Sequence, residues 1–559
     1  MATEFSVREI PFSRSGAWFG LSPVVGLARY AQDVHVVSHR NGMHAVLSLV
    51  PSRPTEIIAD PAVLTWRSGE SRIQAVFSSP TTLRLSGSGL GMRVAAAERT
   101  LTPFTGTYFF AEPSGGAVFT SYETGHRFRV TVLSGQSKHV GAEDLGTADR
   151  AVVLGAEPWE LVIEELTTAK EPFSGGTGFA GEVSAARAEF GRFVDAVAPS
   201  GASAAELACY VLWSATVAPA GFVGRPAVLM SKHWMNKVWS WDHCFNALAL
   251  APGAPELAWH QFQVVFDHQD AQGALPDSIT HSEVLRNFVK PPIHGWTLSR
   301  LRSLLPGGLP DPELAYRQLS AWTSFWLDHR RAPGRRLPYY EHGNDSGWDN
   351  STVFREERLV ESADLAAFMV LQMKELAVLA AELGDDIPWR ERADEMLAAM
   401  LEELWDGSRF VSRAVVSGEL RSTASLLDLM PVVLGEHLPR EVFDRLCAGV
   451  AEHLTSIGPA TELPSSAYYE ADGYWRGPVW APATVLIEDG LRRGGAVELA
   501  DQVSARFRAT CEKSGFAENF DALTGQGLRD RAYTWTASAY LLLSGGDTAA
   551  AAGTPAPTS

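Results

Sequence analysis

Apolar residues follow two different periods in this chain, one before and one after about residue 180. In the first part, short runs partly alternate between apolar and polar positions, as in residues 72–77 (RIQAVF) and 126–133 (HRFRVTVL), and clusters of Gly, Ser, Pro and Asp separate them. Alternation with a period of two is typical of half-buried strands, and many short strands with turns between them favour a sandwich. Residues 1–180 are therefore predicted to form an antiparallel β-sandwich.

From residue 181 the period approaches 3.6, which is typical of helices. Residues 181–200 predict a linker helix, and about twelve helices are predicted between residues 201 and 545, with short links such as 384–386 (GDD) that imply antiparallel neighbours. Six helical hairpins closed into a ring would form an (α/α)6 barrel, with the longer links gathered at one end. Residues 546–559, rich in Ala, Pro and Thr, predict a disordered tail. The predicted fold class is α+β with several domains.

The composition excludes several classes of partner. The 559 residues carry a net charge of −18, which argues against nucleic acid or an anionic membrane as a partner. No apolar run is long enough to span a bilayer, and the first residues lack the apolar core of a signal peptide. The four cysteines are far apart and have no metal-ligand spacing, so reduced thiols and a cytoplasmic location are expected. The oligomeric state is not predicted.

Two carboxylates lie close together in residues 341–354 (EHGNDSGWDNSTVF), just before a long apolar helix pattern. Asp345 and Asp349 stand on either side of Gly347 and Trp348. An indole beside a carboxyl group excludes water and raises the pKa of that group, as a general acid near neutral pH requires. Taken alone, the stretch is better explained as a capped surface loop with two solvated aspartates, because Gly, Asn and Ser are common in such loops.

A second candidate stretch precedes a predicted helix at residues 241–251. Trp239 and Trp241 flank a serine and are followed by Asp242. Indole faces suit the C–H surfaces of sugar rings, and a carboxylate accepts short hydrogen bonds from two sugar hydroxyls. A helix-capping aspartate beside two buried tryptophans explains the same residues equally well.

Three later loops contribute further candidates. Trp296 could face the mouth of the ring, whereas His294 beside it is more often structural than catalytic. Arg476 could bind a pair of sugar hydroxyls or hold a catalytic carboxylate, although an arginine stem lying along tryptophan, such as Trp480, is the simpler explanation. Glu518 has aromatic neighbours and is far in sequence from Asp349; alone, it fits a solvated surface glutamate.

Signatures of other chemistries are weak or missing. One Gly-x-Gly-x-x-Gly match occurs at residues 176–181 (GTGFAG), but no strand-like run directly precedes it and no second strand closes a βαβ unit, so we interpret it as a hinge. The sequence has no Walker loop, no His-Glu-x-x-His, no Cys-x-x-Cys and no Gly-x-Ser-x-Gly elbow. Neither a cofactor nor a metal is predicted. The candidate loops do share a pair of carboxylates, as glycosidic hydrolysis requires, and aromatic residues accompany them.

Five of these stretches together resemble glycoside hydrolase family 63 and, at the acid-bearing loop, the related trehalases of family 37. They occur in family order over about residues 201–545. They are 239–245 (WSWDHCF), 291–296 (PPIHGW), 345–351 (DSGWDNS), 474–480 (YWRGPVW) and 518–525 (ENFDALTG). The bacterial branch most similar to this chain includes mannosylglycerate and glucosylglycerate hydrolases and other α-glucosidases.

The resemblance implies an (α/α)6 barrel, inversion at the anomeric carbon, Asp349 as general acid and Glu518 as general base. The residues that it implies for the sugar pocket, together with Trp348 beside the acid, are Trp239, Trp241, Asp242, Trp296, Arg476 and Trp480. In one respect the chain departs from the family: Asp345 stands where the motif usually carries glutamate.

The resulting hypothesis is an inverting, exo-acting α-glycosidase, namely an α-glucosidase that hydrolyses short α-glucosides. Alternatives with the same fold are a mannosylglycerate or glucosylglycerate hydrolase, a trehalase and a debranching α-1,6-glucosidase. The small glycerate-glycoside hydrolases lack an N-terminal β domain, which weakens the case for a glycerate aglycone. Alternatives of other classes are a non-catalytic carbohydrate-binding protein, and a lyase or epimerase, which would usually depend on a His or Tyr base.

Overall fold

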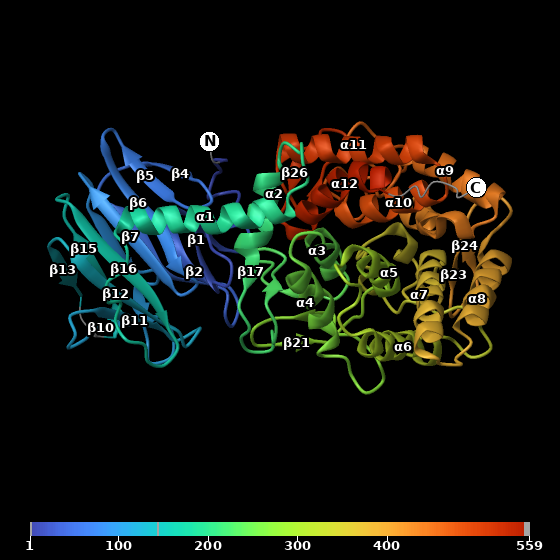
Figure 1. Ribbon diagram of the computed structural model, residues 1–559, viewed down its shortest axis with the longest axis horizontal. Helices are drawn as coiled ribbons and strands as arrows, with labels where there is room; N and C mark the ends of the chain where they lie inside the picture. Colours follow the sequence, from blue (N-terminus) through green and yellow to red (C-terminus); the bar gives the residue numbers. More distant parts are fainter. Residues whose placement is uncertain (1–2, 142–144, 553–559) are drawn as a thin grey trace. The chain divides into compact units, whose positions relative to one another are not determined.

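A computed structural model describes residues 3–141 and 145–552 of the protein (Figure 1). The chain divides into two compact units. The first, called here the sheet-rich unit, comprises Met1–Ala196, Cys209–Lys237 and Thr280–Glu283. The second, called the helical unit, comprises Val197–Ala208, Val238–Ile279 and Val284–Ser559.

Two antiparallel sheets form most of the sheet-rich unit. In spatial order the first contains β1 (Phe19–Gly26), β2 (Arg29–Ser38), β3 (His44–Pro51), β8 (Met92–Ala96), β15 (Ala151–Leu154) and β13 (Ser137–Val140). The second contains β10 (Thr107–Ala111), β11 (Ala117–Ser121), β12 (Arg127–Ser134), β16 (Trp159–Leu166), β7 (Thr82–Ser88), β6 (Ser71–Ser79), β5 (Leu64–Ser68) and β4 (Glu56–Ala59). The short pairs are β9 (Thr100–Leu101) with β14 (Gly146–Thr147), and β17 (Thr216–Val217) with β18 (Ala227–Val228). The predicted antiparallel, sheet-rich N-terminal region is confirmed.

Apolar residues from both sheets meet in one core. The ring of Phe19 in β1 lies 5.2 Å from that of Phe77 in β6 and 5.5 Å from that of Phe128 in β12, measured between ring centres. In β2, Val34 and Val36 are buried and the residue between them is less buried. This is the alternation visible in the sequence, because successive side chains of a strand point to opposite faces.

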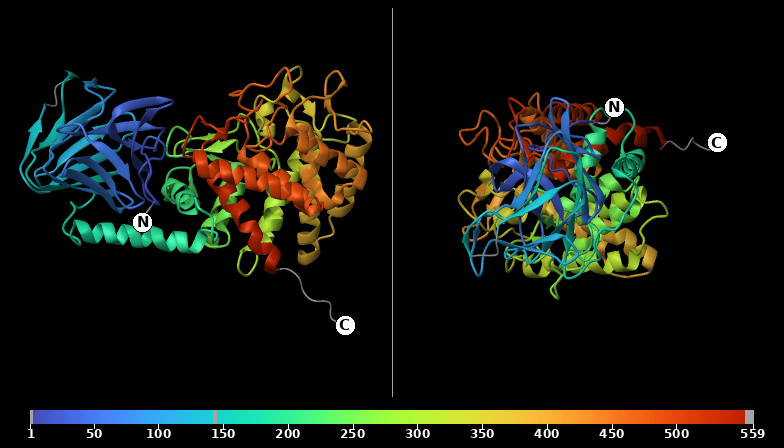
Figure 2. Two further views of the ribbon diagram at one scale, coloured as in Figure 1. Left: turned by 90° about the horizontal axis from the view of Figure 1, so that it is seen from above. Right: turned by 90° about the vertical axis from the view of Figure 1, so that its left-hand side faces the viewer.

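The helix α1 (Phe179–Val197) follows the sheets and runs alongside them (Figure 2). Ala186, with Phe179 and Val183, packs against a small apolar cluster that includes Val76 of β6. The segment that we predicted as a linker helix therefore buries one side against the sheet-rich unit.

Residues 209–237, which lie beyond the boundary predicted at residue 200, also belong to the sheet-rich unit. The Tyr210 hydroxyl donates a hydrogen bond to the carbonyl of Ser13 at 3.2 Å. The backbone N–H of Gly16 donates to the carbonyl of Thr216 at 2.9 Å. These bonds to the first residues of the chain explain why this segment is grouped with the strands.

Helices and small sheets of two or three short strands form the other elements of the described chain. The helices are α2 (Ala205–Ala215), α3 (Asp242–Leu250), α4 (Pro255–Phe266), α5 (His294–Leu304), α6 (Pro312–His329), α7 (Ala363–Leu383), α8 (Trp389–Leu404), α9 (Arg440–His453), α10 (Ala481–Arg493), α11 (Val497–Ser514) and α12 (Thr534–Ala552). The 3-10 helices are η1 (Gly343–Ser346), η2 (Thr352–Phe354) and η3 (Leu426–His437). The short strands are β19 (Val238–Trp239), β20 (Ser278–Ile279), β21 (Val284–Leu285), β22 (Val360–Glu361), β23 (Ser412–Ala414), β24 (Leu420–Arg421), β25 (Asn519–Phe520) and β26 (Gly527–Leu528).

Helical elements of the helical unit contact one another in a closed sequence. α3 packs against α5, α5 against α7, α7 against η3, η3 against α10, α10 against α12, and α12 against α3. All residues of α3 are buried, as expected for a helix that is covered on every side. In contrast, α9 buries one stripe, which includes Val442, Leu446 and Val450 at helical spacing, and packs on η3.

The structure differs from two local expectations. Residues 426–437, in the region predicted to be α-helical, form the 3-10 element η3, because the Pro431 ring would clash with the preceding turn of an α-helix and Gly435 departs from helical φ and ψ. In the predicted tail, residues 546–552 continue α12, because its run of alanines favours a helix; residues 553–559 lie outside the described part of the chain.

Two findings bear on the environment of the chain. All four cysteines are free thiols, and the cytoplasmic location that we predicted from their spacing stays a prediction. Within residues 3–141 and 145–552, no helix combines the length and the apolar character that crossing a membrane requires.

Candidate active site

The acid-bearing loop, residues 341–354, is held in shape by a buried aspartate. One oxygen of Asp345 accepts the Val289 N–H at 3.0 Å. Its other oxygen accepts from the Arg330 guanidinium at 2.8 Å and from the Glu341 N–H at 2.9 Å. With both carboxylate oxygens bonded to the protein, Asp345 anchors the loop.

A close approach to an indole requires the glycine in this loop. Gly347 ends η1 with φ of 75°, a left-handed conformation that glycine adopts easily. A Cβ atom at this position would lie 2.5 Å from Cζ2 of Trp241. The glycine therefore lets the loop lie directly on the Trp241 ring, two residues before Asp349.

Asp349 is half-buried and lies among other charged groups. Burial raises the pKa of Asp349, and the nearby Lys290 ammonium opposes that rise. Lys290 is itself buried: it lies 3.2 Å from Asp277 and donates to the carbonyl of Asn344 at 2.9 Å. Burial acts to lower the pKa of Lys290, but the surrounding carboxylates, Asp349 first, raise it above its ordinary value.

Asp242 is the first residue of α3 and is 4% exposed. Burial raises the pKa of Asp242 to about 8, and the charge of Lys290 opposes this rise. Oδ2 of Asp242 has no hydrogen-bond partner among the described residues. The helix-capping explanation does not hold, because the cap residue is Trp241 and no side chain caps α3. Trp239, in β19, is half-buried beside this aspartate in sequence.

Glu518 lies just before β25 and is 1% exposed. Its backbone N–H donates to the carbonyl of Asp530 at 2.7 Å. Burial raises the pKa of Glu518 to about 8; the charge of Asp530 adds to the rise, while Arg529 and a hydrogen bond with the Tyr474 hydroxyl oppose it. Oε1 of Glu518 has no hydrogen-bond partner in the part of the chain that the structure describes.

Tyr474 is a residue on which both candidate catalytic carboxyl groups act. Burial raises the pKa of the Tyr474 hydroxyl, and the charges of Glu518 and Asp349 raise it further. Asp349 and Glu518, which are far apart in sequence, therefore both act on the same hydroxyl.

Tryptophans form one side of this site. The ring centre of Trp475 lies 4.1 Å from that of Trp480, with the planes 7° apart, and 4.7 Å from that of Trp348. Trp241 contacts Trp475 at 6.3 Å. Trp480 is fully buried, and its indole N–H donates to the carbonyl of Tyr474 at 2.8 Å. Trp480 thus supports the backbone that carries Tyr474.

One side chain joins the acid-bearing loop to the segment that carries Tyr474. The Asn350 amide donates to the carbonyl of Gly473 at 3.0 Å and accepts the Trp475 N–H at 2.9 Å. The residue that follows Asp349 therefore fixes the distance between the two segments.

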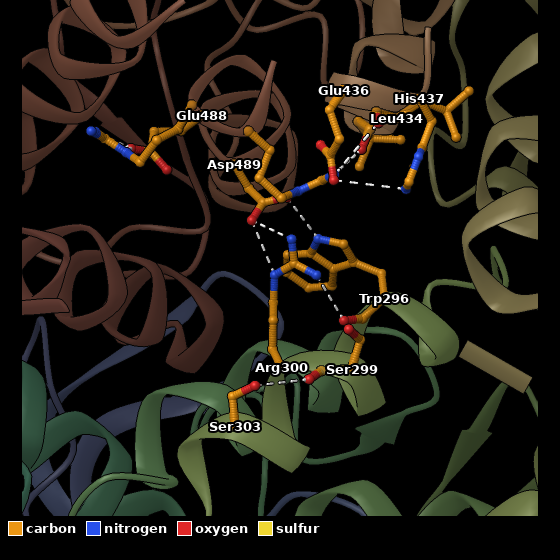
Figure 3. Close-up of polar contacts among 12 residues, drawn as sticks. Trp296, Ser299, Arg300, Ser303, Leu434, Glu436, His437, Glu488 and Asp489 are labelled. Carbon is orange, nitrogen blue, oxygen red and sulfur yellow. Dashed lines mark hydrogen bonds and ion pairs between the residues drawn. The ribbon is translucent and has the colours of Figure 1, made fainter. Parts of the chain in front are cut away.

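Three residues singled out in the sequence have other partners in the structure. The indole N–H of Trp296 donates to Asp489 at 3.0 Å, and Arg300 lies 4.3 Å from its ring centre (Figure 3). Arg476 pairs with Glu470 at 2.9 Å. The sugar-pocket roles of Trp296 and Arg476 stay predictions.

The third of these residues, His294, is structural in this arrangement. Its Nε2 bonds with the carbonyl of Ser240 at 3.0 Å, and burial lowers the pKa of His294 to about 4.

Several charged or hydroxyl groups of the site had no role in the sequence analysis. They are Lys290, Asp277, Tyr474, Arg529 and Asp530. Lys290 and Tyr474 border or belong to recognised motifs, which is a signal that could have identified them. Asp530 lies between two arginines ahead of α12, a pattern that resembles any charged surface turn. Among the described residues, no group of three or more His, Cys, Asp or Glu side chains is arranged to hold a metal ion.

Comparisons with known proteins show which family and fold the chain matches. Residues 235–536 match the family profile described as the mannosylglycerate hydrolase MGH1-like glycoside hydrolase domain. A mannosylglycerate hydrolase from Rubrobacter radiotolerans is 24% identical over 396 residues, which cover 54% of this chain and 89% of that protein. A glucosylglycerate hydrolase from Mycolicibacterium hassiacum is 22% identical over 408 residues, covering 54% of this chain and 91% of that protein.

A crystal structure of the GH63 mannosylglycerate hydrolase from Thermus thermophilus in complex with glucose is similar in fold. It superposes with a TM-score of 0.51 and 22% identity, covering 60% of this chain and 98% of that one. The similarity establishes a shared fold over that part of the chain.

Proposed function

The chain belongs to the mannosylglycerate hydrolase MGH1-like family of glycoside hydrolases, and we propose that it is an inverting, exo-acting α-glucosidase that hydrolyses short α-glucosides. One observation carries this proposal: Glu518 and Asp349, which are far apart in sequence, both act on the Tyr474 hydroxyl. Two carboxyl groups with room for a sugar and a water between them are what inversion requires.

In the proposed reaction, Asp349 protonates the glycosidic oxygen and Glu518 accepts a proton from a water that attacks from the opposite face of the sugar. Such a pair is typically separated by roughly 6.5–9.5 Å. Burial raises the pKa of both carboxyl groups, so these values alone do not distinguish acid from base. The assignment rests on the family motifs that contain each residue.

The proposed glucose pocket lies at the first turn of α3. Oδ2 of Asp242, Oγ of Ser240 and Oγ of Ser278 are buried and have no hydrogen-bond partner among the described residues. Buried polar atoms normally have partners, and the hydroxyls of a sugar ring can supply them. Trp239 and Trp241 would contact the C–H faces of the ring. In this proposal Trp348 and Trp480 support the site.

We further infer that the helical unit is an (α/α)6 barrel. The closed sequence of contacts through α3, α5, α7, η3, α10 and α12 supports this inference. The candidate residues lie in the first turns of α3 and α5 or in loops that precede α3, α7, α10 and α12, as expected for a site at one mouth of such a barrel.

The roles of the two carboxyl groups can be separated with an α-glucosyl fluoride, which needs no proton to release its leaving group. Asp349→Asn should lose about 10²–10⁴-fold in kcat on α-glucosides but much less on the fluoride. Glu518→Gln should lose activity on both. The opposite pattern would exchange the two roles. Proton NMR should show the β-anomer of glucose forming first, and formation of the α-anomer first would contradict inversion.

A second candidate keeps the reaction and changes the substrate. Two relatives are named as mannosylglycerate and glucosylglycerate hydrolases, which favours a glycerate glycoside as substrate. Comparing kcat/KM on mannosylglycerate, glucosylglycerate, trehalose and α-1,4- and α-1,6-glucosides would decide between the candidates. A clear preference for a glycerate glycoside would replace the α-glucosidase proposal.

A further inference from the structure

Two residues beside Glu518 have a backbone conformation that is unusual for their type. Tyr474 has φ of 63° and Arg529 has φ of 61°. Only two other non-glycine residues in the described ranges, Ala28 and Asn41, have positive φ. Non-glycine residues are disfavoured in this region, and such strain persists only where the surroundings enforce it, often at functional sites.

The two strained residues are in contact and are held from both sides. The guanidinium carbon of Arg529 lies 4.8 Å from the ring centre of Tyr474. Arg529 pairs at 2.7 Å with Asp472, which lies two residues before Tyr474. On another side, the ring centre of Trp480 lies 4.9 Å away at a steep angle to the Tyr474 ring. The Tyr474 ring therefore has little freedom to turn.

Both residues act on the carboxyl group of Glu518. The Glu518 N–H donates to the carbonyl of Asp530, the residue that follows Arg529, at 2.7 Å. The Tyr474 hydroxyl and the positive charge of Arg529 both favour the ionised form of the Glu518 carboxyl group. The groups that act on Glu518 or on the hydroxyls beside it are Asp530, Arg529, Tyr474, Tyr533, Asp349 and Asp242. Arg529 is the single cation of this set, and the carboxylates in it are negative.

We propose that Tyr474 and Arg529 form a positioning pair that makes the buried Glu518 carboxyl group easier to ionise and aims it at the attacking water. This inference rests on the proposed function, because a general base must be ionised to accept a proton. The strained backbone at both positions holds the hydroxyl and the guanidinium where Glu518 needs them. A tyrosine hydroxyl that donates to a carboxylate favours the charged form, and an arginine nearby does the same.

The pH dependence of kcat/KM tests the pair. Tyr474→Phe and Arg529→Met should each move the acidic limb of the profile upward, by about one pH unit for the arginine, because ionisation of Glu518 becomes harder. Arg529→Lys should restore most of the shift. Tyr468→Phe is the matched control. Tyr468 lies on the same segment as Tyr474 and also has an arginine on its ring, because Arg355 lies 4.2 Å from the ring centre. Its profile should be unchanged.

A second measurement does not depend on turnover. Infrared spectra recorded at several pH values, with the spectrum of Glu518→Gln subtracted, isolate the protonation of the Glu518 carboxyl group. In Tyr474→Phe this protonation should occur at higher pH than in the unaltered protein. Asp472→Asn is a further variant, because Asp472 is 61% exposed and its change should leave the fold intact while releasing Arg529. Equal loss of activity at every pH, with an unmoved titration, would overturn the inference. Absence of α-glycoside hydrolysis by the unaltered protein would instead overturn the proposed function.

Discussion

Replacing Glu518 by glutamine should stabilise the protein while abolishing its activity. Glu518 is 1% exposed, and burial raises its pKa from 4.5 to about 8. The unfolded chain leaves the same carboxyl group in water, with an ordinary pKa. Between pH 4.5 and 8 the folded protein thus holds a proton that the unfolded chain has released, so stability falls as the pH rises through this window.

The size of the effect follows from the shift. At pH 7 the unfolded carboxyl group is about 2.5 units above its pKa, and each unit corresponds to about 1.4 kcal/mol. The buried glutamate therefore lowers the free energy of unfolding by about 3 kcal/mol at pH 7 and by under about 1 kcal/mol at pH 5. Glutamine has no proton to lose, so the advantage of Glu518→Gln should grow over this range.

Calorimetric unfolding of both proteins between about pH 5 and pH 8 measures this growth. The variant should unfold a few degrees higher at pH 7 and at nearly the same temperature at pH 5. Glu498→Gln, at an exposed position of α11, is the control and should show no such trend. A difference that stays constant with pH would refute the argument that burial of an ionisable group causes the instability.

Two other changes test how the acid-bearing loop is built. Gly347→Ala should destabilise the protein by about 2–4 kcal/mol, because it adds both a left-handed backbone cost and a clash with Trp241. The control Gly334→Ala, with φ of 74° and no atom near its Cβ, should cost only about 1 kcal/mol. Thermal unfolding measures both losses of stability, and equal losses would contradict the clash with Trp241. Lys290→Met removes the cation that lowers the pKa of Asp349, so the basic limb of the kcat/KM profile should move to higher pH; an unmoved limb would show that Asp349 is not the titrating acid.

The periodicity of the sequence is sufficient to predict the two kinds of structure, for physical reasons. Alternation in β2 reflects a strand with one buried face, and the repeating stripe in α9 reflects a helix packed on one side. The closed sequence of contacts through α3, α5, α7, η3, α10 and α12 joins segments that are far apart in the chain, and local periodicity does not encode such contacts.

The site was predictable by residue type but not by orientation. Asp349 and Glu518 both act on the hydroxyl of Tyr474, and Asp345 is an anchor. The sugar-pocket role of Trp480 stays a prediction; its ring is buried beside Tyr474, and an apolar ring with one donor fits a core and a sugar equally well.

The arginine that acts on a candidate catalytic carboxyl group is Arg529, whereas Arg476 was the candidate for that task. Nothing in the local sequence distinguishes them. Which arginine approaches Glu518 is decided by the left-handed turn at Arg529 and by the bond to Asp472, and both depend on the folded chain.

Because of the hydrogen bonds of the Asn350 amide, activity should depend on segments of the chain that are synthesised late. Its partners, Gly473 and Trp475, are 123 and 125 residues further along the chain. A nascent chain that has emerged only as far as α9 already contains Asp349 but has nothing to hold the following residue in place. Glycoside hydrolysis in a cell-free translation should therefore appear only after the ribosome has delivered the segments beyond α9, which makes turnover a reporter of completed folding.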